Sequence, residues 1–143
     1  MTLPVLPPTT EPLIDENSFA TISWLSFFDS VSSGDLGVSW TPSFVGLTEV
    51  GAAIKTGKYY RLSKKIVYFI ITITPGTNTS ATAGTTYCDN FPLQFASQGA
   101  SCSIIGSAAV LAGVTSTDKR IYTGTWSLIT TPVTLAGIVE VSA

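Results

Sequence analysis

The sequence predicts a mainly β protein of the sandwich or barrel class, preceded by a separate N-terminal region. After Gly37 the chain consists of short runs rich in Val, Ile, Thr, Tyr, Phe and Trp, divided by Gly, Pro, Ser, Asn and Asp. These runs recur at regular spacing, which is typical of a β-sandwich or a barrel. Charged residues make up only 11% of the chain, and Ser, Thr, Gly and Pro take their place, as in turn-rich β proteins.

Length and charge distribution indicate one β domain and a distinct N-terminal segment. The 143 residues suffice for about one domain with a real core. Most of the nine acidic residues lie before position 36, whereas all seven basic residues follow position 54. We therefore divide the chain into residues 1–36, a Pro-rich arm with an amphipathic anchor helix, and residues 37–143, the β domain. The low charge also suits a subunit that hides much of its surface in an assembly.

The first element, residues 1–13 with the sequence MTLPVLPPTTEPL, predicts an extended arm rather than a helix or a central strand. Proline fixes φ and lacks an N–H donor, and this segment contains Pro4, Pro7, Pro8 and Pro12. A polyproline-II-like arm and a disordered tail both remain open on this evidence. The apolar residues in and after the segment favour an arm that docks on another surface; they are Val5, Leu6, Leu13 and Ile14.

The second element, residues 15–34, predicts one amphipathic helix. Asp15, Asn17 and Ser18 can cap its start, and Gly34 can end it. At 100° per residue, one face gathers an aromatic stripe made of Ala20, Trp24, Phe27, Phe28 and Val31. This stripe can pack on the chain's own domain, bundle with other copies, or dock on a larger particle.

The most apolar stretch is GKYYRLSKKIVYFIITITPG, residues 57–76, which predicts a β-hairpin. Residues 58–62 and 66–74 are its strands, and residues 63–65 are its turn. In the second strand Val67, Phe69, Ile71 and Ile73 point to one side, and Ile66, Tyr68, Ile70 and Thr72 point to the other. One set must line the core. The other set is also apolar, so we expect a second copy to cover it, or else loops or the N-terminal helix of the same chain.

The other predicted strands lie in the runs VSWTPSFVGL, TTYCDNFPLQF, ASCSIIGSAAVLAG, RIYTGTWSLI and VTLAGIVEVSA. Residues 76–84, GTNTSATAG, follow a strand and read as a long β-loop. The two cysteines, Cys88 and Cys102, form no CxxC pair, so they do not indicate a metal or dithiol site. We expect two free buried thiols, although the two would bond if strands brought them together.

The residues needed for common enzyme chemistry are missing, so we expect no enzyme, no cofactor and no metal. The chain has no histidine, which removes the usual general base and excludes a Ser-His-Asp triad. The carboxylates of the β domain are Glu49, Asp89, Asp118 and Glu140, and none stands in a setting that suggests glycoside hydrolysis. No phosphate-binding loop, dinucleotide fingerprint or EF-hand is present.

Composition also argues against nucleic acid and membrane partners. The only adjacent basic residues are the pairs at 64–65 and 119–120, too few for a nucleic-acid surface. The longest apolar run, residues 66–71, is far shorter than the ~20 residues of a membrane helix.

The chain resembles proteins of the tailed-phage virion over residues 3–126. Its beginning, LPVLPPTTEPLIDENSFATISWLSFFDSV, is similar to their Pro-rich P-L-(I/V)-D segment followed by a short helix with a tryptophan and paired aromatics. Its β part is similar to the receptor-binding or tip domains of phage tail fibres and to related small virion domains. The positions that carry this second likeness are Trp40, Pro42, Gly57, Tyr59, Arg61, Val67, Phe69, Tyr87, Asn90, Phe91 and Pro92.

The resemblance implies a jelly-roll-like antiparallel β-sandwich that forms a homotrimer on the outside of a phage tail or head. It implies attachment through the N-terminus to tail, portal or capsid proteins. The residues expected to attach are Pro7, Pro8, Leu13, Ile14, Trp24, Phe27, Phe28 and Val31. The trimer interface or core is expected at Ile66, Val67, Tyr68, Phe69, Ile70 and Ile71.

Three functions follow as expectations. The first is a short tail-fibre or appendage subunit whose β domain contacts the host surface, including a host glycan. The second is a capsid decoration or cement protein that stabilises the shell. The third, from a different class, is a carbohydrate-binding module or glycan-active enzyme. The chain has no long fibre shaft between its helix and its β domain, which favours a stubby appendage or a cement protein.

Overall fold

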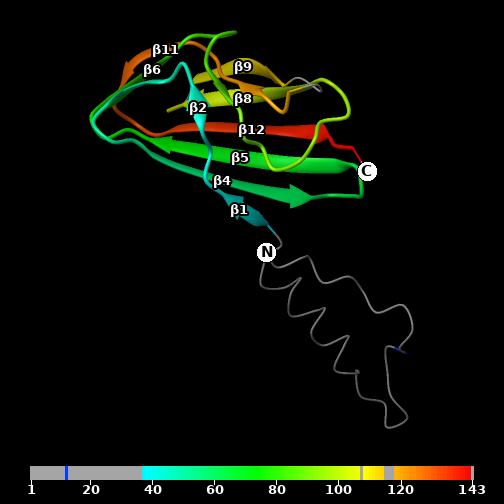
Figure 1. Cartoon of the computed structure of the whole chain (residues 1–143). Coiled ribbons are helices and arrows are strands. Elements are labelled where there is room, and N and C mark those ends of the chain that lie inside the picture. The colour runs from blue at the N-terminus through cyan, green and yellow to red at the C-terminus, as the bar shows by residue number, and fades with distance from the viewer. Residues whose placement is uncertain (1–11, 13–36, 107, 115–117, 143) are drawn as a thin grey trace. The chain divides into compact units, whose positions relative to one another are not determined.

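The computed structural model describes residues 12, 37–106, 108–114 and 118–142, and it is mainly β (Figure 1). Residues 39–143 form one compact unit, separate from the unit of residues 1–38. The described part contains no helix. Its strands are β1 (Val38–Trp40), β2 (Phe44–Val45), β3 (Thr48–Val50), β4 (Ile54–Arg61), β5 (Ile66–Thr74), β6 (Asn78–Ala81), β7 (Tyr87–Cys88), β8 (Gly99–Ile105), β9 (Ala108–Val114), β10 (Ile121–Tyr122), β11 (Trp126–Ile129) and β12 (Val133–Glu140).

The predicted mainly β class is confirmed, with antiparallel sheets that curl. A nine-stranded sheet has the order β1-β4-β5-β12-β8-β9-β10-β7-β2, and a three-stranded sheet has the order β11-β6-β3. Every strand pair with a defined register is antiparallel. The predicted arm and the predicted helix of residues 15–34 lie outside the described residues.

The predicted hairpin of residues 57–76 is confirmed as β4 and β5. Their register runs from Ile54 opposite Thr74 to Arg61 opposite Val67, so the first strand begins earlier than position 58. At the turn, the Ser63 hydroxyl accepts hydrogen bonds from the backbone N–H groups of Lys65 and Ile66, at 3.2 and 3.0 Å. A serine that satisfies two backbone donors in this way fixes the turn and therefore the register of both strands.

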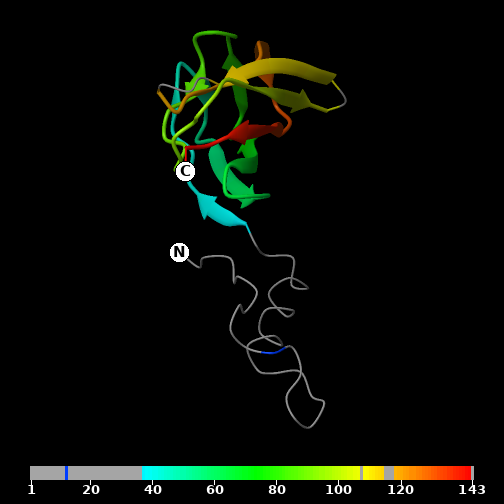
Figure 2. The ribbon, with the colours of Figure 1, turned by 90° about the vertical axis from the view of Figure 1, so that its right-hand side faces the viewer.

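The sheet curls until its two ends share one core. Strand β12 lies in the middle, paired on one side with β5 and on the other with β8 (Figure 2). At the far end of the sheet, the Asp89 N–H donates to the Ser43 carbonyl, and the Asn90 side chain donates to the Thr41 carbonyl. These bonds tie the segment after β7 to the segment between β1 and β2, so the aromatic residues that follow β7 come to lie against β4 and β5.

Phe91 is the centre of the core. Its ring lies 5.3 Å from Trp40, 5.8 Å from Tyr59 and 5.8 Å from Phe69, and it stacks on Phe95 at 5.0 Å (centroid distances). All but Trp40 are buried. The contacts with Trp40 and Phe69 are edge-on, the geometry that the ring quadrupole favours. A residue that follows β7 and belongs to no strand therefore fills the space between the two ends of the curled sheet.

The prediction of a long loop over residues 76–84 is wrong, because residues 78–81 form β6, the middle strand of the small sheet. Thr79 points inward and is fully buried, and its hydroxyl accepts a hydrogen bond from the Trp126 indole N–H at 3.2 Å. The strand was missed because its inward-facing residues are Thr and Ala. A search for alternating apolar residues does not identify a threonine that is buried because its hydroxyl has a hydrogen-bond partner.

Replacing Phe91 with alanine should destabilise the domain by about 3–5 kcal/mol, because it removes the shared contact of both ends of the sheet and leaves a cavity. Urea unfolding followed by tryptophan fluorescence measures this change. Leu62→Ala is the matched control, since Leu62 is exposed and should cost less than about 1 kcal/mol. Equal losses for the two variants would contradict the central role of Phe91.

Candidate functional site

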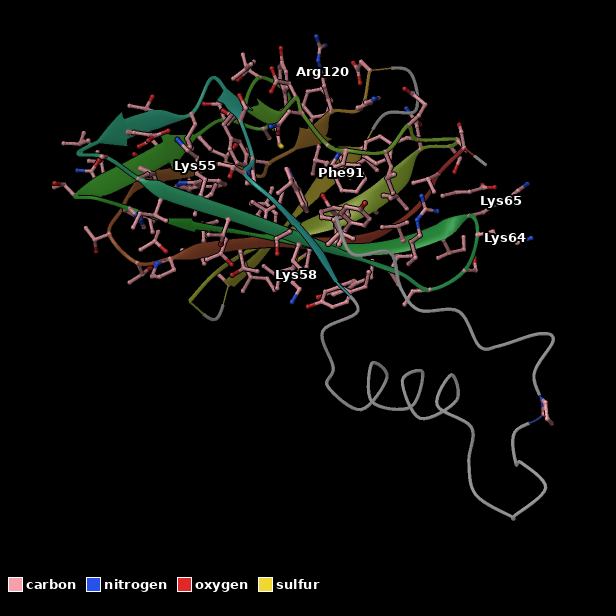
Figure 3. All side chains as sticks on the ribbon, turned by 60° about the horizontal axis from the view of Figure 1, so that its bottom comes forward. Lys55, Lys58, Lys64, Lys65, Phe91 and Arg120 are labelled. Atoms are coloured by element: carbon pink, nitrogen blue, oxygen red, sulfur yellow. The ribbon has the colours of Figure 1, made fainter. Side chains whose placement is uncertain are left out.

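The face of the large sheet that points away from the core forms a continuous surface over four strands. Cross-strand neighbours define it: Lys58, Ile70, Ala136 and Cys102 form one row from β4 to β8, and Tyr60, Tyr68 and Ile138 form a second row. A third row contains Thr56, Thr72, Thr134 and Ile104. We call this surface the outer face. Figure 3 shows Lys58 and Phe91 on opposite sides of the sheet.

Strand β5 supplies both the core and the outer face. Val67, Phe69, Ile71 and Ile73 have no exposed surface and line the core, whereas Ile66, Tyr68, Ile70 and Thr72 are half-buried on the outer face. The six residues predicted for interface or core are therefore divided equally between the two sides. Which of them meets another subunit stays a prediction.

The outer face is largely apolar at its centre, and no described element packs over it. Ile138 is 56% exposed and Ile104 is 39% exposed, although both are large aliphatic residues in regular strands. Two charged residues lie on its strand positions, Lys58 on β4 and Glu140 on β12, and β5 separates them. A contiguous apolar surface with few charges marks an interaction site more often than it marks ordinary surface.

Stacked aromatic side chains lie at one end of this face. The rings of Tyr60 and Tyr68 stack at 5.9 Å with an angle of 29° between their planes. The ammonium group of Lys58 lies over the Tyr60 ring, 5.6 Å from its centroid. Cross-strand aromatic pairs stabilise a sheet and hold their side chains in place, so this end of the face presents a rigid surface.

A groove of about 460 Å³ continues the outer face at the sheet edge near β1. Its lining residues are Ser39, Trp40, Thr41, Lys55, Thr56, Gly57, Lys58, Ile70 and Thr72. Gly57 is required here, since a Cβ on it would lie 2.7 Å from the Trp40 ring. The groove thus combines an indole, several hydroxyl groups and two ammonium groups.

Two ion pairs of the β domain are local. Lys55 pairs with Glu49, and Arg120 pairs with Asp118 at 3.1 Å. The Arg120 guanidinium also lies 4.4 Å from the centroid of the Tyr87 ring. A hydrogen bond with the Tyr122 side chain raises the pKa of Arg120, so the guanidinium stays charged. The sequence shows Lys119 and Arg120 only as an adjacent basic pair. The stack on Tyr87 could not be predicted from it, because the stack depends on the pairing of β7 with β10.

The two cysteines are free and lie on opposite sides of the sheet system. Cys88 is buried beside the core, and its thiol donates to the Asn90 side-chain oxygen at 3.3 Å. Burial raises the pKa of the Cys88 thiol from about 9.0 to about 11, because the thiolate would lose its hydration. Cys102 is partly exposed on the outer face. Both thiols are free, as expected, but the expected burial is wrong for Cys102, because alternation along β8 places it on the outer face.

No protein-family model matches the chain, and neither does any curated protein or solved structure.

Among residues 37–106, 108–114 and 118–142, no group of three His, Cys, Asp or Glu side chains could hold a metal ion. In the same residues, no helix is long and apolar enough to cross a membrane. All the predicted attachment residues lie outside the described ranges: Pro7, Pro8, Leu13, Ile14, Trp24, Phe27, Phe28 and Val31.

Cys88 in the folded chain should resist iodoacetamide at pH 8, since roughly one thiol in a thousand is ionised when the pKa is about 11. Its reaction should accelerate as pH rises toward that pKa. Peptide mass spectrometry after timed alkylation measures the rate, and the urea-unfolded chain is the control. The same rate at pH 8 in folded and unfolded chains would contradict the burial of this thiol.

Proposed function

We propose that this chain is a non-enzymatic structural subunit of a tailed-phage virion, a short tail-fibre or appendage protein. In this proposal the β domain is a jelly-roll-like sandwich that trimerises, and residues 1–36 attach it to tail, portal or capsid proteins. The phage assignment rests on the sequence resemblance. The observation that carries the assembly role is the apolar outer face, with Ile138 and Ile104 exposed in regular strands.

Burial of the outer face would supply the energy for assembly. Each large aliphatic or aromatic side chain moved from water into an interface contributes about 1.5–3 kcal/mol. Tyr68 and Ile70 are already half-buried, so completing their burial and that of Ile138 would offset part of the cost of bringing subunits together.

A second copy of the chain fits this face better than an unrelated charged partner. Most soluble oligomers contain identical subunits related by symmetry. Lys58 and Glu140 lie on different strands of the face, so neighbouring copies about a three-fold axis can place one opposite the other. The remaining positions are apolar or small, as in the centre of an obligate interface.

The groove beside Trp40 supports a second candidate, a site for a host surface glycan. Carbohydrate sites commonly combine an aromatic ring, which stacks on the apolar side of a sugar, with hydroxyl and charged groups that bond its hydroxyls. The groove offers Trp40, Thr56 and Thr72 in this arrangement. This role is compatible with a tail appendage, whereas a cement protein of the capsid needs no such site.

The trimer should have a mass three times that of the 15.0 kDa chain, measured by light scattering coupled to size-exclusion chromatography. The double substitution Ile70→Lys with Ile138→Lys should reduce it to a monomer, because it places lysines in the centre of the contact. Alkylation of Cys102 should accelerate in this variant as the face becomes exposed. Leu62→Lys, on an exposed residue outside the face, is the control. A monomeric parent chain would overturn the trimer.

Deleting residues 1–34 should leave a folded oligomer that no longer joins the virion. Immunoblots of purified particles assembled with the full chain or the shortened chain provide the measurement. Localisation by electron microscopy then distinguishes an appendage on the tail from a cement protein on the capsid. Incorporation of the shortened chain at the level of the full chain would exclude attachment through the N-terminus.

A further inference from the structure

Strand β9 has a largely unpaired edge. It pairs with β8 at seven positions, from Ala108 opposite Ile105 to Val114 opposite Gly99. On its other side, β10 pairs with it only at Val114 (opposite Ile121), so residues 108–113 have no strand partner there among the described residues. Figure 2 shows the β8–β9 hairpin, in yellow, extending past the neighbouring strands. In an antiparallel strand, alternate residues direct their N–H and C=O groups to each side, so this edge presents open backbone groups.

This edge lacks the features that usually prevent edge-to-edge pairing. Proteins protect such edges with short strands, lysines, prolines or bulges. Edge strands β1 and β2 have three and two residues, and β4, next to β1, carries Lys55, Lys58 and Arg61. By contrast, β9 has the sequence AAVLAGV, without charge or proline, and no charged residue occurs anywhere in residues 90–117.

The exposed residues described in β9 are small. Ala108, Ala109 and Gly113 are exposed. A Cβ built on Gly113 would meet no atom within 4 Å, and the same holds for Gly106 at the hairpin turn. Gly106 has a φ of +57°, which a tight two-residue hairpin turn requires. The hairpin is thus sharply closed at its tip, and a larger side chain at Gly113 would meet no described atom on that face of the sheet.

We propose that β9 pairs edge to edge with β9 of a second copy, in antiparallel orientation about a two-fold axis. Two identical strands related by a two-fold axis perpendicular to them are antiparallel, and each satisfies the open backbone groups of the other. The absence of charge makes this strand compatible with itself, because no like charges face each other across the axis. The contact uses an edge rather than the outer face, so it would link copies independently of the proposed trimer contact.

Amide hydrogen exchange of the full chain tests this pairing directly, because a strand added to the edge protects backbone N–H groups that a side-chain contact leaves open. The Ile70→Lys, Ile138→Lys variant serves as the background, so that the proposed trimer contact does not contribute. We expect exchange of peptides that cover residues 106–114 to slow at least tenfold as the protein concentration rises from low micromolar to near millimolar.

A pair of charge variants provides the control. Ala109→Lys with Gly113→Lys should abolish the concentration dependence, and so should Ala109→Glu with Gly113→Glu, because each places like charges across the axis. Mixing the two variants should restore protection. Thr130→Lys with Thr131→Lys, on two exposed residues after β11, adds the same charge and should change nothing. Circular dichroism confirms folding, and Ala108→Lys replaces the double variant if that does not fold.

The outcomes separate this proposal from the trimer. Exchange in residues 106–114 that does not depend on concentration overturns the edge pairing, whatever the mass of the parent chain. Protection that persists in both charge variants also overturns it, because another surface must then cover the strand. A parent chain that forms no trimer but shows charge-sensitive protection of β9 would overturn only the outer-face contact.

Discussion

The packing of Phe91 against both ends of the curled sheet is the interaction on which the rest of this domain depends. The ring contacts Trp40 next to β4, Tyr59 and Phe69 on β4 and β5, and Phe95 further along its own segment. This contact holds the part of the sheet that contains β7, β10 and β2 against β4 and β5. Hydrogen bonds between the Asn90 side chain and the segment before β2 stabilise the same contact between the two ends of the sheet. One aromatic contact and one amide therefore convert a long sheet into a closed core.

That closure determines which side of β5 remains available. The core accepts Val67, Phe69 and Ile71 completely, and the strand alternation then forces Tyr68 and Ile70 outward, where no described residue covers them. The same constraint holds on β12, where Leu135 is buried and Ile138 is 56% exposed. The outer face is apolar because the central strands carry aliphatic residues at both their odd and their even positions. In a monomer much of this apolar surface stays in water, as at Ile138, which is why we connect it with assembly.

The outer face and the edge of β9 differ in physical character, and this difference bears on what each could do. The face offers large side chains, and its binding would depend on burial of apolar area, which is not directional. The β9 edge offers open backbone groups, and its binding would depend on directional hydrogen bonds. Two contacts of different type on one small domain would allow a subunit both to form a closed oligomer and to join neighbouring oligomers.

The sequence by itself determined the mainly β class, the β4–β5 hairpin and the two apolar sides of β5, because each follows from local alternation and turn residues. It also determined the lack of histidine and the scarcity of charge. It did not reveal β6, whose inward threonine is compatible with burial only because Trp126 donates to it. Nor did it reveal the position of Phe91, the stack of Arg120 on Tyr87, or the open edge of β9. These depend on which strands become neighbours across long sequence separations, and only the tertiary structure decides that.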